Sequence, residues 1–267
     1  MMGLVILTAA RMKVSRRIAL LAALAVGCGS AWAAEVKLTV AAAADLRFAL
    51  DELAPRFRAA HPGVNLAITY GSSGSFFAQI QNGAPFDVFL SADVDYPRRL
   101  IAAGLAGKDS LFIYGVGRIV VWVPADSGLD PAAQGIHLLE ASSVRHVAIA
   151  NPQHAPYGRA AEAAMRSLGV YDSVAQKLVL GENIAQAFEF VQAGAAEVGI
   201  VALSLALAPA AREHGRYWEV PADAYPKIEQ GGIILARAPA AAAQFRAFLT
   251  SADGLRLLKQ YGFSMPQ

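Results

Sequence analysis

The chain repeats one local pattern, in which an apolar strand-like segment runs through a short polar or glycine-containing loop into an amphipathic helix. Residues 36–43 predict a buried strand, and residues 46–60 predict a helix because their apolar side chains fall on one helical stripe. Strands that alternate with helices are typical of α/β architecture with largely parallel sheets. A second set of such units begins at residue 118, which indicates one body with two lobes. The same pattern predicts further strands over 65–70, 87–91, 118–123, 145–150, 197–203 and 227–236, and further helices over 76–82, 159–168, 184–193, 240–249 and 254–261.

Residues 1–33 have the layout of a secretory signal peptide. Four basic residues precede an uncharged apolar run over 18–27, and the Ala-Trp-Ala sequence at 31–33 is a small-x-small cleavage site. The apolar run is too short to span a bilayer. Removal of this segment leaves 19 basic and 21 acidic residues, so the net charge changes from +2 to −2. With only 16% charged residues, the chain lacks the dense basic face of a nucleic-acid-binding protein, and we expect no nucleic-acid partner.

The single cysteine, Cys28, lies inside this segment, and two interpretations of it stay open. In the first, Cys28 is removed with the signal peptide, and the Ala-Trp-Ala site favours this outcome. In the second, residues 25–28 (Ala-Val-Gly-Cys) form a lipoprotein site, and Cys28 carries a lipid that anchors the protein. In either case one cysteine supports neither a disulfide bond nor a cysteine-ligated metal site.

Four loops lie where a predicted strand ends and a predicted helix begins. They are Ala43-Ala44-Asp45, Gly71-Ser72-Ser73-Gly74, Pro156-Tyr157-Gly158 and Glu182-Asn183-Ile184. A helix start carries unpaired N–H groups and about half a positive charge, so it binds anions without lysine or arginine. In an open α/β sheet the ligand crevice lies beyond the carboxyl ends of the strands. Two loops from each half of the chain therefore predict a site for one small anion.

Each of these loops also has an ordinary structural interpretation. Residues 71–74 could form a flexible turn, and Tyr157 could be a packing residue. Asp45 and Asn183 are plausible helix caps, and Ile184 would normally belong to the core. The prediction of a site rests on the four helix starts together, because no single loop decides the matter.

Catalytic signatures are weak in this chain. Residues 71–75 differ from the Gly-x-Ser-x-Gly elbow of hydrolases at the fifth position, which is Ser75. The histidines show no metal-ligand spacing to one another. They are His61, His137, His146, His154 and His214. We therefore do not expect an enzyme, and we keep a secreted serine hydrolase that uses Ser73 as the alternative from a different class.

Several motifs resemble one known family over nearly the whole predicted mature chain, from Val36 to Phe263. The most specific is the run over 82–93 (NGAPFDVFLSAD), and others are residues 149–158 (IANPQHAPYG) and 199–204 (GIVALS). In these motifs the chain resembles the periplasmic molybdate-binding proteins (the ModA family) of molybdate ABC transporters.

The resemblance implies the fold of a type II periplasmic binding protein. Such a protein has two lobes, each a mainly parallel sheet flanked by helices, with the ligand in the cleft between them. The implied division is lobe 1 over 34–117 plus 234–267 and lobe 2 over 118–233, with crossover strands near 117–120 and 226–233.

The resemblance also implies roles for residues and partners. The implied oxyanion-binding residues are Ala44, Asp45, Ser72, Ser73, Tyr157 and Ile184. Ser73 would offer its hydroxyl and backbone N–H groups, and Tyr157 and Ile184 would offer backbone N–H groups. The implied ligand is molybdate or tungstate, with no cofactor and with molybdenum present only as molybdate. A periplasmic monomer and an inner-membrane ABC permease with its ATPase are further implications.

The chain departs from the family pattern at two positions. Ala202 stands where some relatives have a binding tyrosine, and Asp45 stands where many have serine or asparagine. A carboxylate ~4 Å from a dianion would be repelled by several kcal/mol at low dielectric. The Asp45 side chain could turn away and cap its helix, could be protonated, or could indicate a different ligand, such as a cationic or zwitterionic solute. We expect the first of these.

Overall fold

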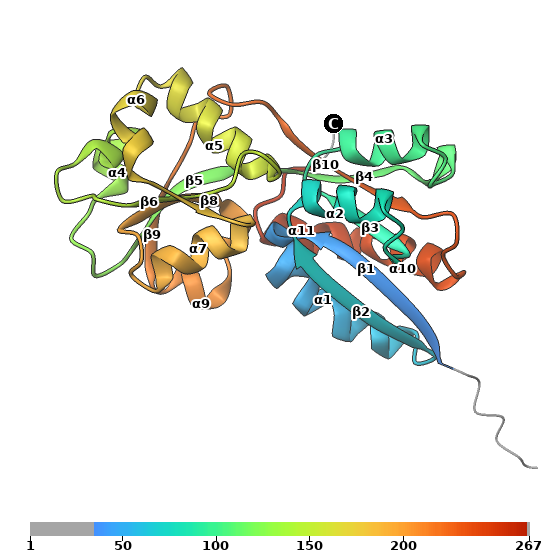
Figure 1. Ribbon diagram of the computed structural model, residues 1–267. Helices are drawn as coiled ribbons and strands as arrows, with labels where there is room; N and C mark the ends of the chain where they lie inside the picture. The colour runs from blue at the N-terminus through green and yellow to red at the C-terminus, as the bar shows by residue number, and fades with distance from the viewer. Residues whose placement is uncertain (1–34, 266–267) are drawn as a thin grey trace, which may run out of the picture. The chain divides into compact units, whose positions relative to one another are not determined.

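Ten strands in residues 35–265 form two five-stranded sheets that are flanked by helices (Figure 1). These residues are the part of the chain that the computed structural model describes, so the predicted signal peptide over 1–33, with Cys28, lies outside the described residues. The strand order is β2-β1-β3-β10-β4 in the first sheet and β7-β6-β8-β5-β9 in the second. The expected α/β architecture is confirmed.

The first sheet contains β1 (Val36–Ala43), β2 (Val64–Gly71), β3 (Val88–Ser91), β4 (Phe112–Gly117) and β10 (Ile228–Ile234). The second contains β5 (Ile119–Pro124), β6 (Val147–Ala150), β7 (Leu178–Gly181), β8 (Val198–Ala202) and β9 (Gly215–Glu219). The helices are α1 (Arg47–Ala60), α2 (Ser73–Gln81), α3 (Asp95–Ala102), α4 (Pro131–Gln134), α5 (Pro156–Ser167), α6 (Tyr171–Val174), α7 (Ile184–Gln192), α8 (Leu203–Ala206), α9 (Pro209–Arg212), α10 (Ala241–Leu249) and α11 (Ala252–Gln260). Short 3-10 turns are η1 (Ala44–Leu46), η2 (Lys108–Ser110), η3 (Gly135–Glu140) and η4 (Ala175–Lys177).

In each sheet four strands run in one direction and one runs against them. The reversed strand is β10 in the first sheet and β5 in the second, and each is antiparallel to both of its neighbours. Both are the strands by which the chain enters one sheet from the other. Each begins beside the carboxyl end of a neighbouring strand, since Ile228 is paired with Gly117 and Ile119 with Ala202. Each crossing strand therefore enters its sheet at the edge where the other four strands have their carboxyl ends.

The crossing strands also bear on the expected division of the chain. β4 ends at Gly117 and β5 begins at Ile119, so a single residue, Arg118, joins the two sheets there. The whole of β10 pairs in the first sheet, including residues 228–233, which the expected division assigned to lobe 2. The lobe boundaries themselves stay a prediction.

The side chains of β1 alternate between two layers of helices. Val40 belongs to a buried cluster with Phe57 of α1 and Phe245 of α10, whose rings meet edge to face with centroids 5.3 Å apart. Ala41, on the opposite face, belongs to a second cluster with Phe76 of α2. Figure 1 shows the result: the red C-terminal helices α10 and α11 lie beside the blue helix α1, which both of them contact. No helix within residues 35–265 is long and apolar enough to cross a membrane.

Candidate functional site

Helix starts from both sheets meet at one small cavity. In the first sheet β1 leads into η1 and α1, and β2 leads into α2; in the second, β6 leads into α5 and β7 into α7. The cavity volume is about 10 Å³, which is room for about one water molecule. The lining consists of Ala43, Ala44, Asp45, Gly71, Ser72, Ser73, Ala92, Ala155, Pro156, Tyr157 and Ile184. It includes all six residues predicted from the sequence as site residues (Ala44, Asp45, Ser72, Ser73, Tyr157 and Ile184), whose part in binding stays a prediction.

Two of these helices have polar N-caps that fix their starts. Ser72 caps α2, and its hydroxyl oxygen accepts a hydrogen bond from the amide of Ser75 at 3.2 Å. Asn183 caps α7, and its side-chain oxygen accepts from the amide of Ala185 at 3.0 Å, which confirms the predicted cap. The first-turn amides that a cap does not take have no acceptor inside their own helix. They are the groups through which a helix start binds an anion.

The hydroxyl group of Ser73, the first residue of α2, is oriented by the end of a neighbouring strand. Its side chain is buried, and its Oγ accepts a hydrogen bond from the amide of Ala92, just after β3, at 2.9 Å. A hydroxyl group that accepts in this way still has its own proton to donate. Ser73 can therefore supply a neutral O–H donor to a ligand in the cavity.

The Asp45 carboxyl group lies at the centre of a buried polar cluster. Its Oδ2 accepts a hydrogen bond from the Tyr157 hydroxyl at 2.9 Å and another from Gln230 Nε2 at 2.6 Å. Gln230 Nε2 also lies 3.0 Å from the Tyr157 hydroxyl. The Asp45 carbonyl oxygen accepts from the Ser204 hydroxyl at 2.7 Å. The other carboxyl oxygen, Oδ1, is buried and has no hydrogen-bond partner.

The expectation that the Asp45 side chain caps its helix is wrong. Neither η1 nor α1 receives a side-chain cap, and the hydrogen bonds to Oδ2 come from other elements, α5 and β10. The physical reason is that the Tyr157 hydroxyl and the Gln230 amide are both buried beside Asp45 and need an acceptor. The carboxyl group is thereby held against the cavity instead of turning back to the backbone.

Burial dominates the ionisation of this cluster. Loss of hydration raises the pKa of Asp45 from 3.8 to about 6, and the hydrogen bonds from Gln230 and Tyr157 oppose the rise. Burial, together with the nearby Asp45 charge, raises the pKa of Tyr157 and Tyr114 well above 10. Both phenols therefore stay protonated at neutral pH, so Tyr157 remains a hydrogen-bond donor.

Sequence reasoning missed Gln230 and Gly117, which complete the Asp45 cluster. Gln230 is a fully buried polar residue of β10, whose sequence is IEQGGII, and its polar neighbour Glu229 leaves no contrast in the sequence that would single it out. A Cβ atom on Gly117 would lie 2.1 Å from the Tyr157 hydroxyl oxygen and 2.8 Å from Gln230 Nε2. A glycine at this position is therefore what allows the two donors to approach Asp45, and no local pattern marks it.

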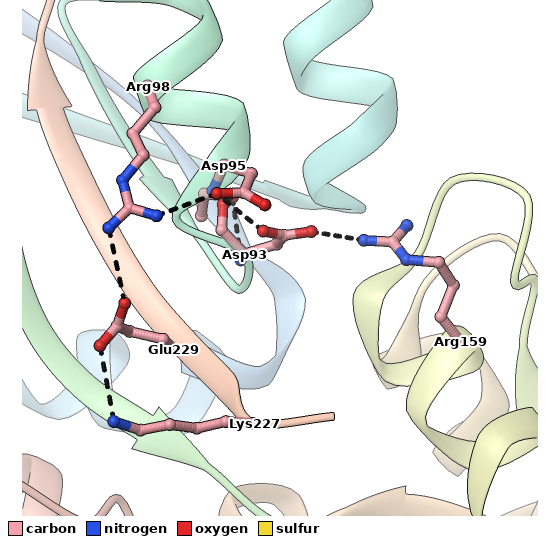
Figure 2. Close-up of polar contacts among 7 residues, drawn as sticks. Asp93, Asp95, Arg98, Arg159, Lys227 and Glu229 are labelled. Carbon is pink, nitrogen blue, oxygen red and sulfur yellow. Dashed lines mark hydrogen bonds and ion pairs between the residues drawn. The ribbon is translucent and has the colours of Figure 1, made fainter. Parts of the chain in front are cut away.

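Around the cavity, side chains from the two sheets form contacts with one another. Figure 2 shows Arg159 of α5 and Asp93, which follows β3, pointing toward one another; Nη2 and Oδ2 are 2.6 Å apart. On another part of the molecule, Arg47 of α1 and Glu189 of α7 form an ion pair at 2.7 Å. The backbone contributes as well, because the amide of Gly74 donates to a carbonyl oxygen in the loop before α5 at 2.9 Å.

In the described part of the chain, Ser73, the serine of the hydrolase alternative, is not hydrogen-bonded to a histidine. The histidine nearest these serines, His154, places Nδ1 2.9 Å from Ser72 Oγ, whereas Ser73 Oγ is bound to a backbone amide. The Glu182 carboxylate lies 3.6 Å from His154 Nε2, which is longer than a hydrogen bond. Ser72 also serves as a helix cap. Within residues 35–265, no group of three or more His, Cys, Asp and Glu side chains is arranged to hold a metal ion.

Comparison with known proteins gives matches over most of the chain. A family profile described as bacterial extracellular solute-binding protein matches residues 38–264. The molybdate-binding protein ModA of Azotobacter vinelandii is 38% identical over 254 residues, which are 94% of this chain and 98% of that protein. ModA of Rhodobacter capsulatus is 39% identical over 203 residues, 75% of this chain and 78% of that protein.

The fold agrees with these sequence matches. The solved structure of the periplasmic molybdate-binding protein of Azotobacter vinelandii superposes with a TM-score of 0.80 at 35% identity, covering 86% of this chain and 100% of that chain. The chain therefore belongs to the bacterial extracellular solute-binding proteins, and within them to the ModA family. The predicted two-lobed α/β fold class is confirmed.

Proposed function

We propose that this protein captures molybdate, and also tungstate, and delivers the anion to an inner-membrane ABC permease and its ATPase. In this proposal it is a monomeric periplasmic binding protein that transforms no substrate and carries no cofactor. The observation that carries the proposal is the meeting of four helix starts, two from each sheet, at one cavity. Relatives at 38% and 39% identity that are named molybdate-binding proteins support the choice of anion.

The chemistry of the lining fits a small oxyanion that must later be released. Among the described residues that line the cavity there is no lysine or arginine, and the donors are backbone amides and the hydroxyl groups of serine and tyrosine. Such donors bind an anion through hydrogen bonds and helix dipoles. We propose that fixed donors on opposite sides select for size, because a smaller tetrahedral anion such as sulfate cannot reach all of them at once.

Capture would involve closure of the two lobes on the anion. We propose that lobe 1 (34–117 plus 234–267) and lobe 2 (118–233) pivot about the strands that join the sheets. Arg118 is the single residue between β4 and β5, which makes this connection a compact hinge. The anion would then be held by η1 and α2 on one side and by α5 and α7 on the other.

The second candidate is a binding protein of the same fold for a cationic or zwitterionic solute. The observation in its favour is the Asp45 carboxyl group, which lines the cavity with one oxygen unpaired. A secreted serine hydrolase is less well supported, because the Ser73 hydroxyl accepts from a backbone amide instead of facing a histidine. A serine-reactive probe that labels the protein would restore that alternative.

Thermal unfolding of the mature chain with molybdate, tungstate, sulfate, phosphate and chromate, each in turn, tests the proposal. A ligand present at 100 times its Kd stabilises the folded state by about 2.7 kcal/mol. We expect molybdate and tungstate to raise the melting temperature, and Ser73→Ala to reduce the rise. Ser142→Ala, a change at an exposed serine in a turn, is the matched control. If no oxyanion raises the melting temperature, the proposal is wrong, and cationic and zwitterionic solutes are tested next.

A further inference from the structure

Among the described side chains that line the cavity, one buried polar atom, Oδ1 of Asp45, has no hydrogen-bond partner. Asp45 is only 1% exposed, so water does not replace the missing partner freely. The Oδ2 atom already accepts from Tyr157 and Gln230, which orients the carboxyl group and leaves Oδ1 as the free end. A buried polar atom of this kind calls for a specific explanation.

Charge makes a carboxylate at this position unfavourable for an anion. The described residues that line the cavity contain no cationic side chain that would neutralise Asp45. A negative carboxylate facing an anion is repelled strongly where the dielectric constant is low. A carboxylic acid reverses the interaction, because its O–H group donates a hydrogen bond. The same oxygen can therefore oppose or hold the anion, depending on one proton.

We propose that Asp45 binds the oxyanion as a neutral carboxylic acid, with Oδ1–H donating to an anion oxygen, so that capture of each anion takes up one proton from solvent. The inference rests on the proposed function. The proton adds to the carboxylate when the anion enters and returns to solvent when the anion leaves, so charge and atoms balance without another reactant. The two donors on Oδ2 act as positioning groups that keep the protonated oxygen on the cavity side.

The burial of Asp45 in the free protein supports this assignment. Burial raises the pKa of Asp45 to about 6, so the acid form is already accessible near neutral pH. A bound anion favours the neutral form further. The affinity is then fully present below about pH 6 and falls by about tenfold for each pH unit above it, as linkage requires for one proton. The fall ends only where pH exceeds the pKa of Asp45 in the complex.

Other ionisable groups near Asp45 behave differently. Tyr157 and Tyr114 stay protonated because burial raises the pKa of each well above 10, and Gln230 does not ionise. His154 is the remaining titratable group bonded to a lining residue, since its ring contacts Ser72. Three ion pairs lie on the same or neighbouring elements: Arg47 of α1 with Glu189 of α7, Arg159 of α5 with Asp93, and Lys227 with Glu229 at β10. The Glu182 carboxylate, before α7, lies 3.6 Å from His154 Nε2.

The test is calorimetric titration of the mature protein with molybdate between about pH 6 and pH 8.5, each pH measured in two buffers of different ionisation enthalpy. The buffer difference gives the number of protons taken up. We expect uptake close to one proton above about pH 7 and a tenfold loss of affinity per pH unit. Asp45→Asn presents a permanent neutral N–H donor of the same shape, so its affinity is expected to be independent of pH and higher than that of the natural protein at pH 8.5.

His154→Gln is the matched control, because it removes the other titratable group and keeps a polar side chain beside Ser72. The pH dependence should persist in this variant. Binding by the natural protein with no proton uptake overturns the inference and leaves the proposed function intact. Proton uptake that persists in Asp45→Asn also overturns it, since the proton is then on the anion or on another group. No binding of any oxyanion by the natural protein or by Asp45→Asn at any pH overturns the proposed function itself.

Discussion

Asp45 affects the stability of the free protein as well as the binding of its ligand. The pKa of its buried carboxyl group is raised from 3.8 to about 6, so the folded state holds the proton more tightly than the unfolded chain does. The stabilisation from this proton is present below about pH 3.8 and is lost as pH rises through about 6. Above that range the buried carboxylate costs the folded protein about 3 kcal/mol.

We therefore predict that Asp45→Asn stabilises the ligand-free protein at pH 8 by up to about 3 kcal/mol and has little effect near pH 4. Asparagine keeps an oxygen acceptor for Tyr157 and Gln230 and cannot ionise. Urea unfolding of both proteins across this pH range measures the difference. A difference that does not change with pH would show that folding does not shift the pKa of Asp45.

Gly117 is the second residue on which the arrangement at Asp45 depends. An alanine Cβ at this position would lie 2.1 Å from the Tyr157 hydroxyl oxygen, so the tyrosine ring must move. We predict that Gly117→Ala destabilises the protein by about 1–3 kcal/mol and weakens molybdate binding by at least about tenfold. Gly107→Ala is the control, because no atom lies within 4 Å of its Cβ position. Urea unfolding measures the effect of both variants on stability, and calorimetric titration measures the effect on molybdate affinity. An unchanged affinity in Gly117→Ala would show that the position of Tyr157 does not affect molybdate binding.

Cavity residues at helix starts could be predicted from the sequence, because a helix start is marked by the residues next to it in the chain. Gly71–Ser73 and Asn183 stand directly between a strand and a helix, and the structure places both at such a junction. Gln230 was not predictable in this way, because it becomes a neighbour of Asp45 only when a distant strand crosses between the sheets. The direction of the Asp45 side chain was predicted wrongly for the same reason, since its partners come from α5 and β10.

At the scale of elements, the sequence predicts strongly apolar segments well. β1 coincides with the predicted strand over 36–43, and α7 begins at Ile184 as predicted. The sequence analysis missed β4, β7 and β9, and their sequences show why. β7 (LVLG) is apolar but only four residues long, and in β9 (GRYWE) charged residues interrupt the apolar pattern. β4 contains two glycines among its six residues, which weakens the strand signal.

The ion pair between α5 and the loop after β3 joins elements of the two sheets. Asp93 uses one oxygen for Arg159 at 2.6 Å and the other for the amide of Asp95 at 2.9 Å. Asp93→Asn keeps the amide contact and removes the charge. Because the pair is partly exposed, it contributes about 0.2–1 kcal/mol. We predict that Asp93→Asn speeds release of bound molybdate by about twofold to fivefold.

Asp95→Asn is the matched control, because Asp95 pairs with Arg98 of the same helix, α3, and this pair does not connect the two sheets (Figure 2). Stopped-flow release of molybdate from the natural protein and both variants measures the rates. Equal effects of the two variants would mean that the loss of negative charge near the cavity, and not the contact between elements, controls release. Repeating the measurement at high salt should reduce the effect of Asp93→Asn, because exposed ion pairs are screened.

At the scale of the whole molecule, the prediction concerns how the two sheets respond together when the anion binds. Helix starts that line the cavity come from both sheets, so an anion bound there contacts four elements, two from each sheet. Opening of any one of these elements then requires release of the anion. We therefore predict that molybdate at 100 times its Kd slows amide hydrogen exchange at the starts of α1, α2, α5 and α7 together, by up to about 100-fold.

The outer strand β9 and the short helix α9 supply internal controls, because neither contributes a residue to the cavity. Their exchange should change little where it occurs by local opening. Hydrogen exchange measured by mass spectrometry with and without molybdate resolves these segments. Protection confined to α1 and α2 would show that one sheet holds the anion and that the second does not close on it. Equal protection at all four starts would mean that the second sheet is as necessary for capture as the first, since a site formed by one sheet alone would leave α5 and α7 exchanging at the rate of the free protein.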